Sequence, residues 1–185
     1  NILTGYTGVI SLGHSLYVGI GAYMTFLLTI TLGLSPWIGM WIGAIAAGLI
    51  GLVIGFFGFR FGMKGVYFVL LTIAFAEIGR LIILHLQVLG SVQGLFITPQ
   101  FSFARFQFKE NIPYYYIGLG YVIFSLIVVR LLEQSKIGRY LVALREDEDA
   151  AESLGVDVFK YKMVAIFISA FMTSLAGVFY TNYLY

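Results

Sequence analysis

Five long apolar stretches dominate the pattern of hydrophobic and polar positions along the chain. They run roughly over residues 12–32, 36–59, 65–86 and 114–132, and from Val164 to beyond Tyr180. Each is close to the ~20 residues that a helix needs to cross a bilayer, and each is too continuous for an amphipathic surface helix. The strict alternation of a membrane β-strand is absent from the sequence. The pattern therefore predicts an all-α, polytopic transmembrane helix bundle with about five spans.

The segment before the first apolar stretch differs from it. Residues Asn1 to Ser11 are more polar and rich in Gly, which favours a broken or half-spanning segment. The chain begins without Met and stops at Tyr185 inside an apolar run. We therefore expect residues 1–185 to form one transmembrane domain, a fragment that lacks elements at both ends.

Composition agrees with a membrane protein. Hydrophobic residues make up 60% of the chain and charged residues 11%, with no Cys, whereas a typical soluble domain is about 25% charged. These values exclude a disulfide-stabilised secreted domain, a disordered chain and an ordinary soluble enzyme. The net charge of +2 gives no indication of nucleic-acid binding.

The distribution of Lys and Arg predicts the orientation of the spans. Arg80 lies inside the third stretch, and Arg105 and Lys109 lie in the loop from Gln87 to Pro113. The remaining eight basic residues lie on the opposite side, which the positive-inside rule places in the cytoplasm. They are Arg60, Lys64, Arg130, Lys136, Arg139, Arg145, Lys160 and Lys162.

Small residues recur every four positions in the second stretch. Such a stripe allows two helices to approach closely in lipid, so it predicts a helix–helix contact. A path for solute lined by backbone is the alternative. The stripe consists of Gly39, Gly43, Ala47, Gly51 and Gly55.

The predicted cytoplasmic loop, residues 133–163, contains an acidic run followed by small residues. Residues 135–156 predict one short helix with its acidic residues at the start, where the helix dipole favours them. Ala150, Ala151 and Leu154 would form a small apolar face, and Gly155 suits the left-handed position that ends a helix. From the residues alone, a solvated loop helix and a docking surface remain equally open.

This segment resembles the loop with a Glu-Ala-Ala motif found in permease subunits of ATP-binding cassette (ABC) importers. The chain as a whole is similar to the LivM type of branched-chain amino acid permease. The motifs that carry this resemblance occur in order along most of the chain. They lie at residues 5–8, 11–14, 19–23, 65–68, 74–77, 138–156 and 174–180.

The resemblance implies a function and a set of partners. It implies a multi-pass subunit of the cell inner membrane that moves branched-chain amino acids by alternating access. Its partners would be ABC ATPase subunits, a second permease subunit and an extracytoplasmic solute-binding protein. The chain has no phosphate-binding GxxxxGK[ST] loop, so ATP would be hydrolysed on a partner chain, and no cofactor is expected. The coupling helix that docks on the ATPase would comprise Glu148, Asp149, Ala150, Ala151, Glu152, Leu154 and Gly155.

Polar residues near the first span form a second group of candidates. Thr7, Ser11, His14 and Ser15 follow one another at helical spacing. On one helix they would share a face, which would line a solute path or bond to a neighbouring helix. For His14 we favour a hydrogen-bonded packing role over proton transfer.

Glu77 and Arg80 lie one turn apart in the third stretch and can form an ion pair. Ionisable residues inside a membrane are expensive and suggest function. A pair that holds the bundle together and a contact with solute are both open.

Three alternatives to a branched-chain amino acid permease are compatible with parts of the sequence. A related ABC permease could carry urea or another short amide. An ion-coupled secondary transporter could use Glu77, Arg80 and His14 as a relay. An intramembrane enzyme has little support, because two His, no Cys and no HExxH motif give neither catalytic residues nor a metal site. Genes for ATPases and a binding protein beside this one would distinguish the ABC importer from a secondary transporter.

Overall fold

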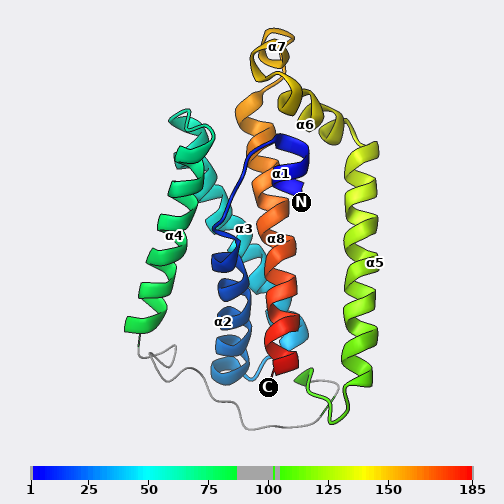
Figure 1. Ribbon diagram of the computed structural model, residues 1–185. Helices are drawn as coiled ribbons and strands as arrows, with labels where there is room; N and C mark the ends of the chain where they lie inside the picture. Colours follow the sequence, from blue (N-terminus) through cyan, green and yellow to red (C-terminus); the bar gives the residue numbers. More distant parts are fainter. Residues whose placement is uncertain (1, 87–101, 103–104, 185) are drawn as a thin grey trace.

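The computed structural model describes residues 2–86, 102 and 105–184. These residues form eight α-helices joined mostly by short turns (Figure 1). The helices are α1 (Ile2–Thr7), α2 (His14–Leu32), α3 (Pro36–Arg60), α4 (Val66–His85), α5 (Ile112–Gln134), α6 (Lys136–Glu146), α7 (Glu148–Ser153) and α8 (Val158–Leu184).

Five of these helices are long and apolar enough to cross a membrane: α2, α3, α4, α5 and α8. Each coincides with one of the predicted stretches, so the prediction of an all-α bundle with five spans is confirmed. Pro36 occupies the first turn of α3, where its missing N–H costs nothing. Gly33 ends α2 in the left-handed conformation, with φ of 65°.

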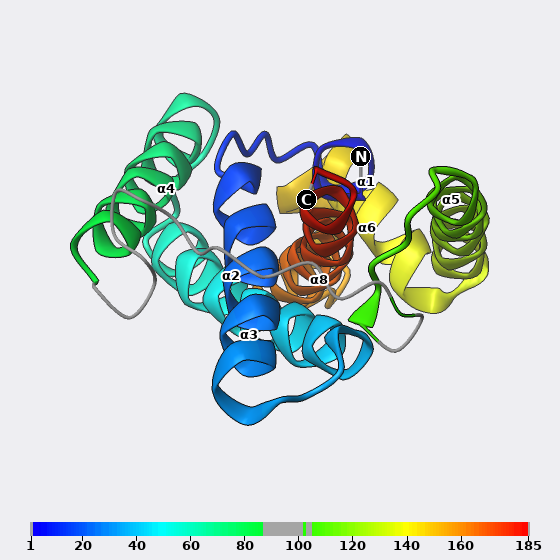
Figure 2. The same cartoon turned by 90° about the horizontal axis from the view of Figure 1, so that it is seen from below.

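The helices α2, α3 and α8 pack together as the centre of the bundle (Figure 2). The small-residue stripe of α3 makes these contacts. A Cβ added at Gly39 would lie 3.1 Å from the side chain of Thr25 on α2, and one added at Gly51 would lie 2.9 Å from Ala170 on α8. The predicted helix–helix contact is confirmed, because the stripe of small residues packs against both α2 and α8.

The helices α4 and α5 flank this centre on opposite sides (Figure 2). Each contributes few buried residues: Phe68 and Thr72 from α4, and Tyr114 and Leu132 from α5. Most of their apolar surface is therefore open to lipid or to other membrane helices.

The N-terminal segment is broken, as predicted. α1 spans only six residues, and the backbone leaves the helical conformation from Gly8, whose φ is 69°. It becomes helical again at His14. Arg145 of α6 holds α1 in place, since its Nη1 donates a hydrogen bond to the carbonyl of Gly5 at 2.9 Å.

The turn between α3 and α4 lies at the same end of the molecule as α6 and α7 (Figure 1). Side-chain contacts join different parts of the chain at each end of the bundle. At the end with α7, Lys64 and Lys162 form ion pairs with Glu148. At the opposite end, the ring centres of Trp37 and Phe106 lie 4.5 Å apart. The predicted division of basic residues between two sides agrees with this arrangement. Residues 87–101 of the predicted outer loop lie outside the described residues.

Candidate functional site

The segment from 135 to 156 forms two helices rather than the one expected. The side chain of Ser135 caps α6 by accepting a hydrogen bond from the N–H of Gly138 at 3.1 Å. At Asp147 the backbone is extended, and its Oδ1 accepts from the N–H of Ala150 at 3.0 Å. The prediction of a single helix was wrong because Asp147 is a better N-cap than a helix interior residue.

Gly155 ends α7 in the left-handed conformation, as predicted, with φ of 85°. Two backbone hydrogen bonds close the end: the N–H of Val156 donates to the carbonyl of Ala151 at 3.1 Å, and the N–H of Gly155 donates to that of Glu152 at 2.9 Å. This pair of bonds is the Schellman motif. It turns the chain sharply from α7 into α8.

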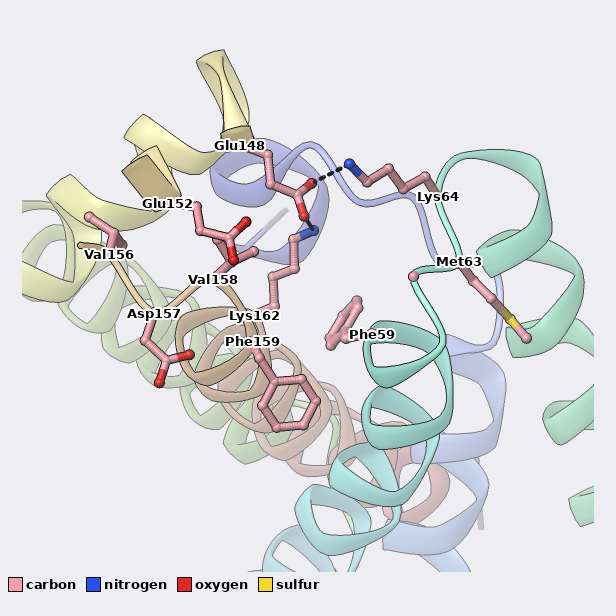
Figure 3. Close-up of a pocket in the computed structure, with 11 residues that line it drawn as sticks. Phe59, Met63, Lys64, Glu148, Glu152, Val156, Asp157, Val158, Phe159 and Lys162 are labelled. Carbon is pink, nitrogen blue, oxygen red and sulfur yellow. Dashed lines mark ion pairs between the residues drawn. The ribbon is translucent and has the colours of Figure 1, made fainter. Parts of the chain in front are cut away.

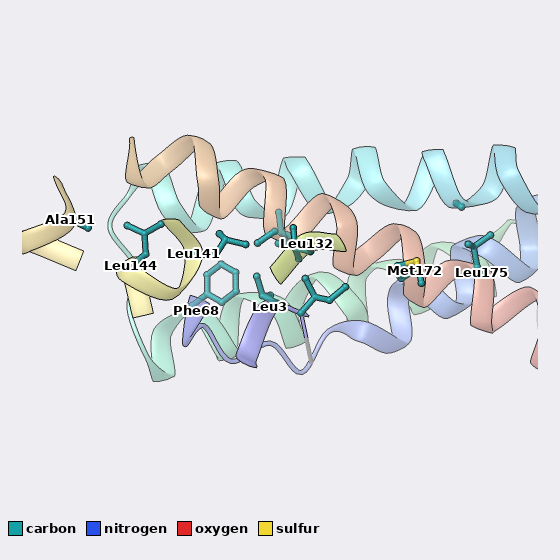
Figure 4. Close-up of a cluster of buried hydrophobic side chains, with 12 residues drawn as sticks. Leu3, Phe68, Leu132, Leu141, Leu144, Ala151, Met172 and Leu175 are labelled. Carbon is teal, nitrogen blue, oxygen red and sulfur yellow. The ribbon is translucent and has the colours of Figure 1, made fainter. Parts of the chain in front are cut away.

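The predicted apolar face of α7 does not exist as one surface. Ala151 is buried and belongs to a cluster that includes Leu141 and Leu144 of α6 (Figure 4). Leu154, by contrast, is 86% exposed. The expectation failed because α6 covers the side of α7 that carries Ala151. Of the predicted coupling residues, those that are exposed are Asp149, Ala150, Glu152, Leu154 and Gly155.

Glu148 connects α7 to two other parts of the molecule (Figure 3). Its Oε1 lies 2.8 Å from Nζ of Lys162 on α8, and its Oε2 lies 3.6 Å from Nζ of Lys64 in the turn between α3 and α4. The three residues line a pocket of about 360 Å³ with Phe59 at its wall. Glu148 therefore links α7 to α8 and to that turn through two ion pairs.

The environment of Glu148 favours its charged form. Burial raises the pKa of its carboxyl, but the hydrogen bond and charge of Lys162, together with Lys64, more than offset this and hold the pKa below its ordinary value. The ammonium of Lys162 also lies 5.7 Å from the centre of the Phe59 ring. Its side chain is only 9% exposed, so Glu148 is the counter-ion of a buried charge.

The polar residues near the first span do not form one face. Thr7 lies in α1 and Ser11 in the non-helical link, while His14 and Ser15 begin α2. The break in the helix separates them, which contradicts the shared face. Nε2 of His14 lies 3.0 Å from Oγ of Ser169 on α8, in agreement with a packing role. Ser15 is exposed and lines a groove between α2 and α4.

Glu77 and Arg80 form the expected ion pair within α4. Nε of Arg80 donates to Oε2 of Glu77 at 2.9 Å, and the two side chains are 58% and 53% exposed for Arg80 and Glu77 respectively. Both line the groove that Ser15 lines. These bonds between Glu77 and Arg80 stay within one helix, so a role in joining helices gains no support.

The sequence analysis used Lys64 and Lys162 only to predict the orientation of the spans and missed their contact with Glu148. A signal was present for Lys162, since this charged residue is the fifth residue of α8. A charge so close to a membrane span needs a partner. The partner itself depends on how α7 folds back, which the sequence pattern does not show.

Comparison with known proteins gives one family and two named relatives. The family model described as "Branched-chain amino acid transport system / permease component" matches residues 1–185. The high-affinity branched-chain amino acid transport system permease protein LivM of Escherichia coli (strain K12) is 29% identical over 96% of this chain. The protein of the same name from Salmonella typhimurium is 28% identical over 96%. The chain covers 47% of each relative, about half its length. No solved structure matches.

Proposed function

The chain belongs to the family of branched-chain amino acid transport system permease components, and on this premise we propose that it is the membrane-spanning subunit of an ABC importer. It carries branched-chain amino acids across the inner membrane by alternating access, while separate ATPase subunits hydrolyse ATP. A second permease subunit and an extracytoplasmic solute-binding protein complete the transporter. The observation that carries this proposal is the family match along the whole chain, supported by the names of both relatives.

In this proposal residues 133–163 are the cytoplasmic loop and α7 is the coupling helix. Two features of α7 support that role. It projects beyond the membrane helices (Figure 1), and its tip exposes Leu154, a large apolar side chain that water solvates poorly. Acidic residues around it, Asp149 and Glu152, would set the register of docking against a basic groove.

The link from docking to transport runs through Glu148. An ATPase that closes on α7 moves Glu148, whose two ion pairs connect it to α8 and to the turn between α3 and α4. These are the ends of three membrane helices. ATP binding then favours one arrangement of those helices over the other, as a two-state transporter requires.

The test of transport is uptake into proteoliposomes that hold the complete complex. With ATP inside and binding protein outside, labelled leucine, isoleucine and valine should enter, and urea should not. Entry of urea alone would favour the short-amide permease. Leucine uptake that needs an ion gradient and no ATP would favour the secondary transporter and contradict the proposal.

The test of docking is the variant Leu154→Ala. Loss of an exposed apolar contact at the centre of an interface costs about 1–2 kcal/mol, or roughly 5–30-fold in the Kd for the ATPase. Ile112→Ala is the matched control, because Ile112 is 62% exposed at the opposite end of the bundle. Equal ATPase binding by both variants, measured with purified subunits, would contradict docking at α7.

A further inference from the structure

The groove between α2 and α4 contains a charged pair at membrane depth that the coupling mechanism does not use. Glu77 is the twelfth residue of α4, so at 1.5 Å per residue it lies about 16 Å from one end of the helix and about 12 Å from the other. More than half of each side chain of the pair is exposed. The pair therefore faces the open groove near the middle of the membrane.

Lipid is a poor neighbour for such a pair. Ionisable groups inside membranes face water-filled cavities or polar partners, because hydrocarbon solvates neither charge. The rest of the groove is largely apolar, with Leu12 and Leu16 on one wall and Ile73 and Ile83 on the other. Its volume of about 550 Å³ is in the range of small-molecule sites.

The backbone beside the groove is also unusual. Non-helical backbone at membrane depth occurs where it is buried or lines a cavity, and transporters bind solutes where a helix is interrupted. Here the link between α1 and α2 packs on α4, since the N–H of Leu12 donates to Oγ1 of Thr72 at 3.2 Å. A Cβ at Gly13 would lie 2.5 Å from the carbonyl of Thr72. The interruption thus contacts α4 at Thr72, about one and a half turns from Glu77.

We infer that this groove is a transient binding site for a zwitterionic α-amino acid with an apolar side chain, held by Glu77 and Arg80. The ammonium of the solute bonds to the carboxylate of Glu77 and its carboxylate accepts from the guanidinium of Arg80. Its side chain lies against Leu16 and Ile73. This inference rests on the proposed function and names the residues that would contact its substrate.

The charge balance explains why a zwitterion fits. In the empty groove each charge of the pair neutralises the other. A zwitterion splits this pair and supplies one new partner to each, so every charge stays paired throughout. A solute with one charge leaves Glu77 or Arg80 unpaired, and urea offers no charge at all. Ser15 adds the hydroxyl of a third polar side chain at the edge of the groove.

The experiment measures binding of labelled leucine to the complete permease–ATPase complex in nanodiscs, without the binding protein. We expect Glu77→Gln and Arg80→Gln each to weaken leucine binding at least tenfold. 4-Methylpentanoate, which lacks the ammonium, and isopentylamine, which lacks the carboxylate, should compete at least tenfold less well than leucine. Arg130→Gln is the matched control, because Arg130 and Glu133 form another i,i+3 pair, on α5 outside the groove.

A charge-swapped variant separates solute contact from a structural role. Glu77→Arg combined with Arg80→Glu keeps an ion pair on α4 but reverses the ends of the site. We expect this variant to assemble and to stay impaired in leucine binding. In uptake assays with binding protein present, its kcat should fall at least tenfold while its KM, set by the binding protein, stays unchanged. Recovery of binding and kcat in the swapped variant would show a structural pair and overturn the inference.

The outcomes also separate this inference from the proposed function. Normal leucine uptake by both Gln variants, with unchanged binding, contradicts the groove alone. A wild-type complex that binds leucine through Glu77 and Arg80 but moves no branched-chain amino acid contradicts the proposed function alone.

Discussion

The ion pairs of Glu148 give the sharpest prediction about how α7 is held. The variant Glu148→Gln removes the counter-ion of Lys162, whose ammonium is almost fully buried, while it leaves the shape of the side chain nearly unchanged. A fully buried charge that loses its partner costs about 3–5 kcal/mol. The side chain of Glu148 is 26% exposed, so water can partly solvate the Lys162 ammonium in its place. We therefore expect the free energy of unfolding to fall by about 2 kcal/mol.

The neighbouring lysines provide matched comparisons. Lys64 is 64% exposed and 3.6 Å from Glu148, so Lys64→Met should cost less than about 1 kcal/mol. Lys162→Met removes the buried charge together with its solvation cost and leaves Glu148 paired with Lys64. Lys162→Met should therefore cost less stability than Glu148→Gln. The double variant Glu148→Gln/Lys162→Met should recover part of the stability that Glu148→Gln loses.

Thermal unfolding of the purified chain in detergent measures this order. A loss of about 2 kcal/mol corresponds to a fall in Tm of roughly 4–8 °C for a domain of this size. In the full transporter, Glu148→Gln should still hydrolyse ATP but take up less leucine per ATP, because the ion pair between α7 and α8 would be lost. A Tm of Glu148→Gln equal to that of Lys64→Met would refute the reasoning that Glu148 neutralises a buried charge.

Three further predictions concern pH and glycine positions. The pKa of Glu148 in the folded protein lies below its ordinary value of 4.5. The stability that Glu148 contributes is therefore complete above pH 4.5 and is lost as the pH falls through the folded pKa. Measuring Tm at decreasing pH should show this loss in the wild type and not in Glu148→Gln. Gly155→Val should cost about 1–2 kcal/mol through its positive φ, with Gly155→Asn less harmful, and equal Tm values would contradict the strained turn. Gly177→Ala should lower Tm, because the new Cβ would lie 2.5 Å from the carbonyl of Val18, and this overcrowding costs about 1–3 kcal/mol of stability. Gly120→Ala is the comparison, since its Cβ meets no atom within 4 Å, and it should preserve or raise Tm.

The membrane architecture was predictable because it depends on one strong signal. A span must be long, apolar and helical, so the apolar stretches located the five long helices. The stripe at Gly39 and Gly51 likewise predicted close packing, since close packing in lipid needs small residues. Boundaries were less accurate: α8 begins at Val158, six residues before the predicted stretch, because helical backbone continues into the polar region beyond an apolar core.

The site was predictable only where a local rule decides the conformation. The left-handed Gly155 follows from the need of a helix end for positive φ. The burial of Ala151 and the exposure of Leu154 depend instead on how α6 folds over α7, which is a tertiary contact. The same holds for Lys162 and Glu148, which are 14 residues apart in sequence and meet only because α7 turns back onto α8.

The most direct test of the central claim places a reactive group at the tip of α7. Residues 1–185 contain no Cys, so in the variant Leu154→Cys the new thiol is the only one among these residues, and the parent protein is the labelling control. In intact cells it should resist a membrane-impermeant maleimide, react once the membrane is opened, and form a disulfide with a cysteine in the groove of the ATPase subunit. Labelling of Leu154→Cys from outside intact cells would place α7 on the wrong side of the membrane and contradict the account.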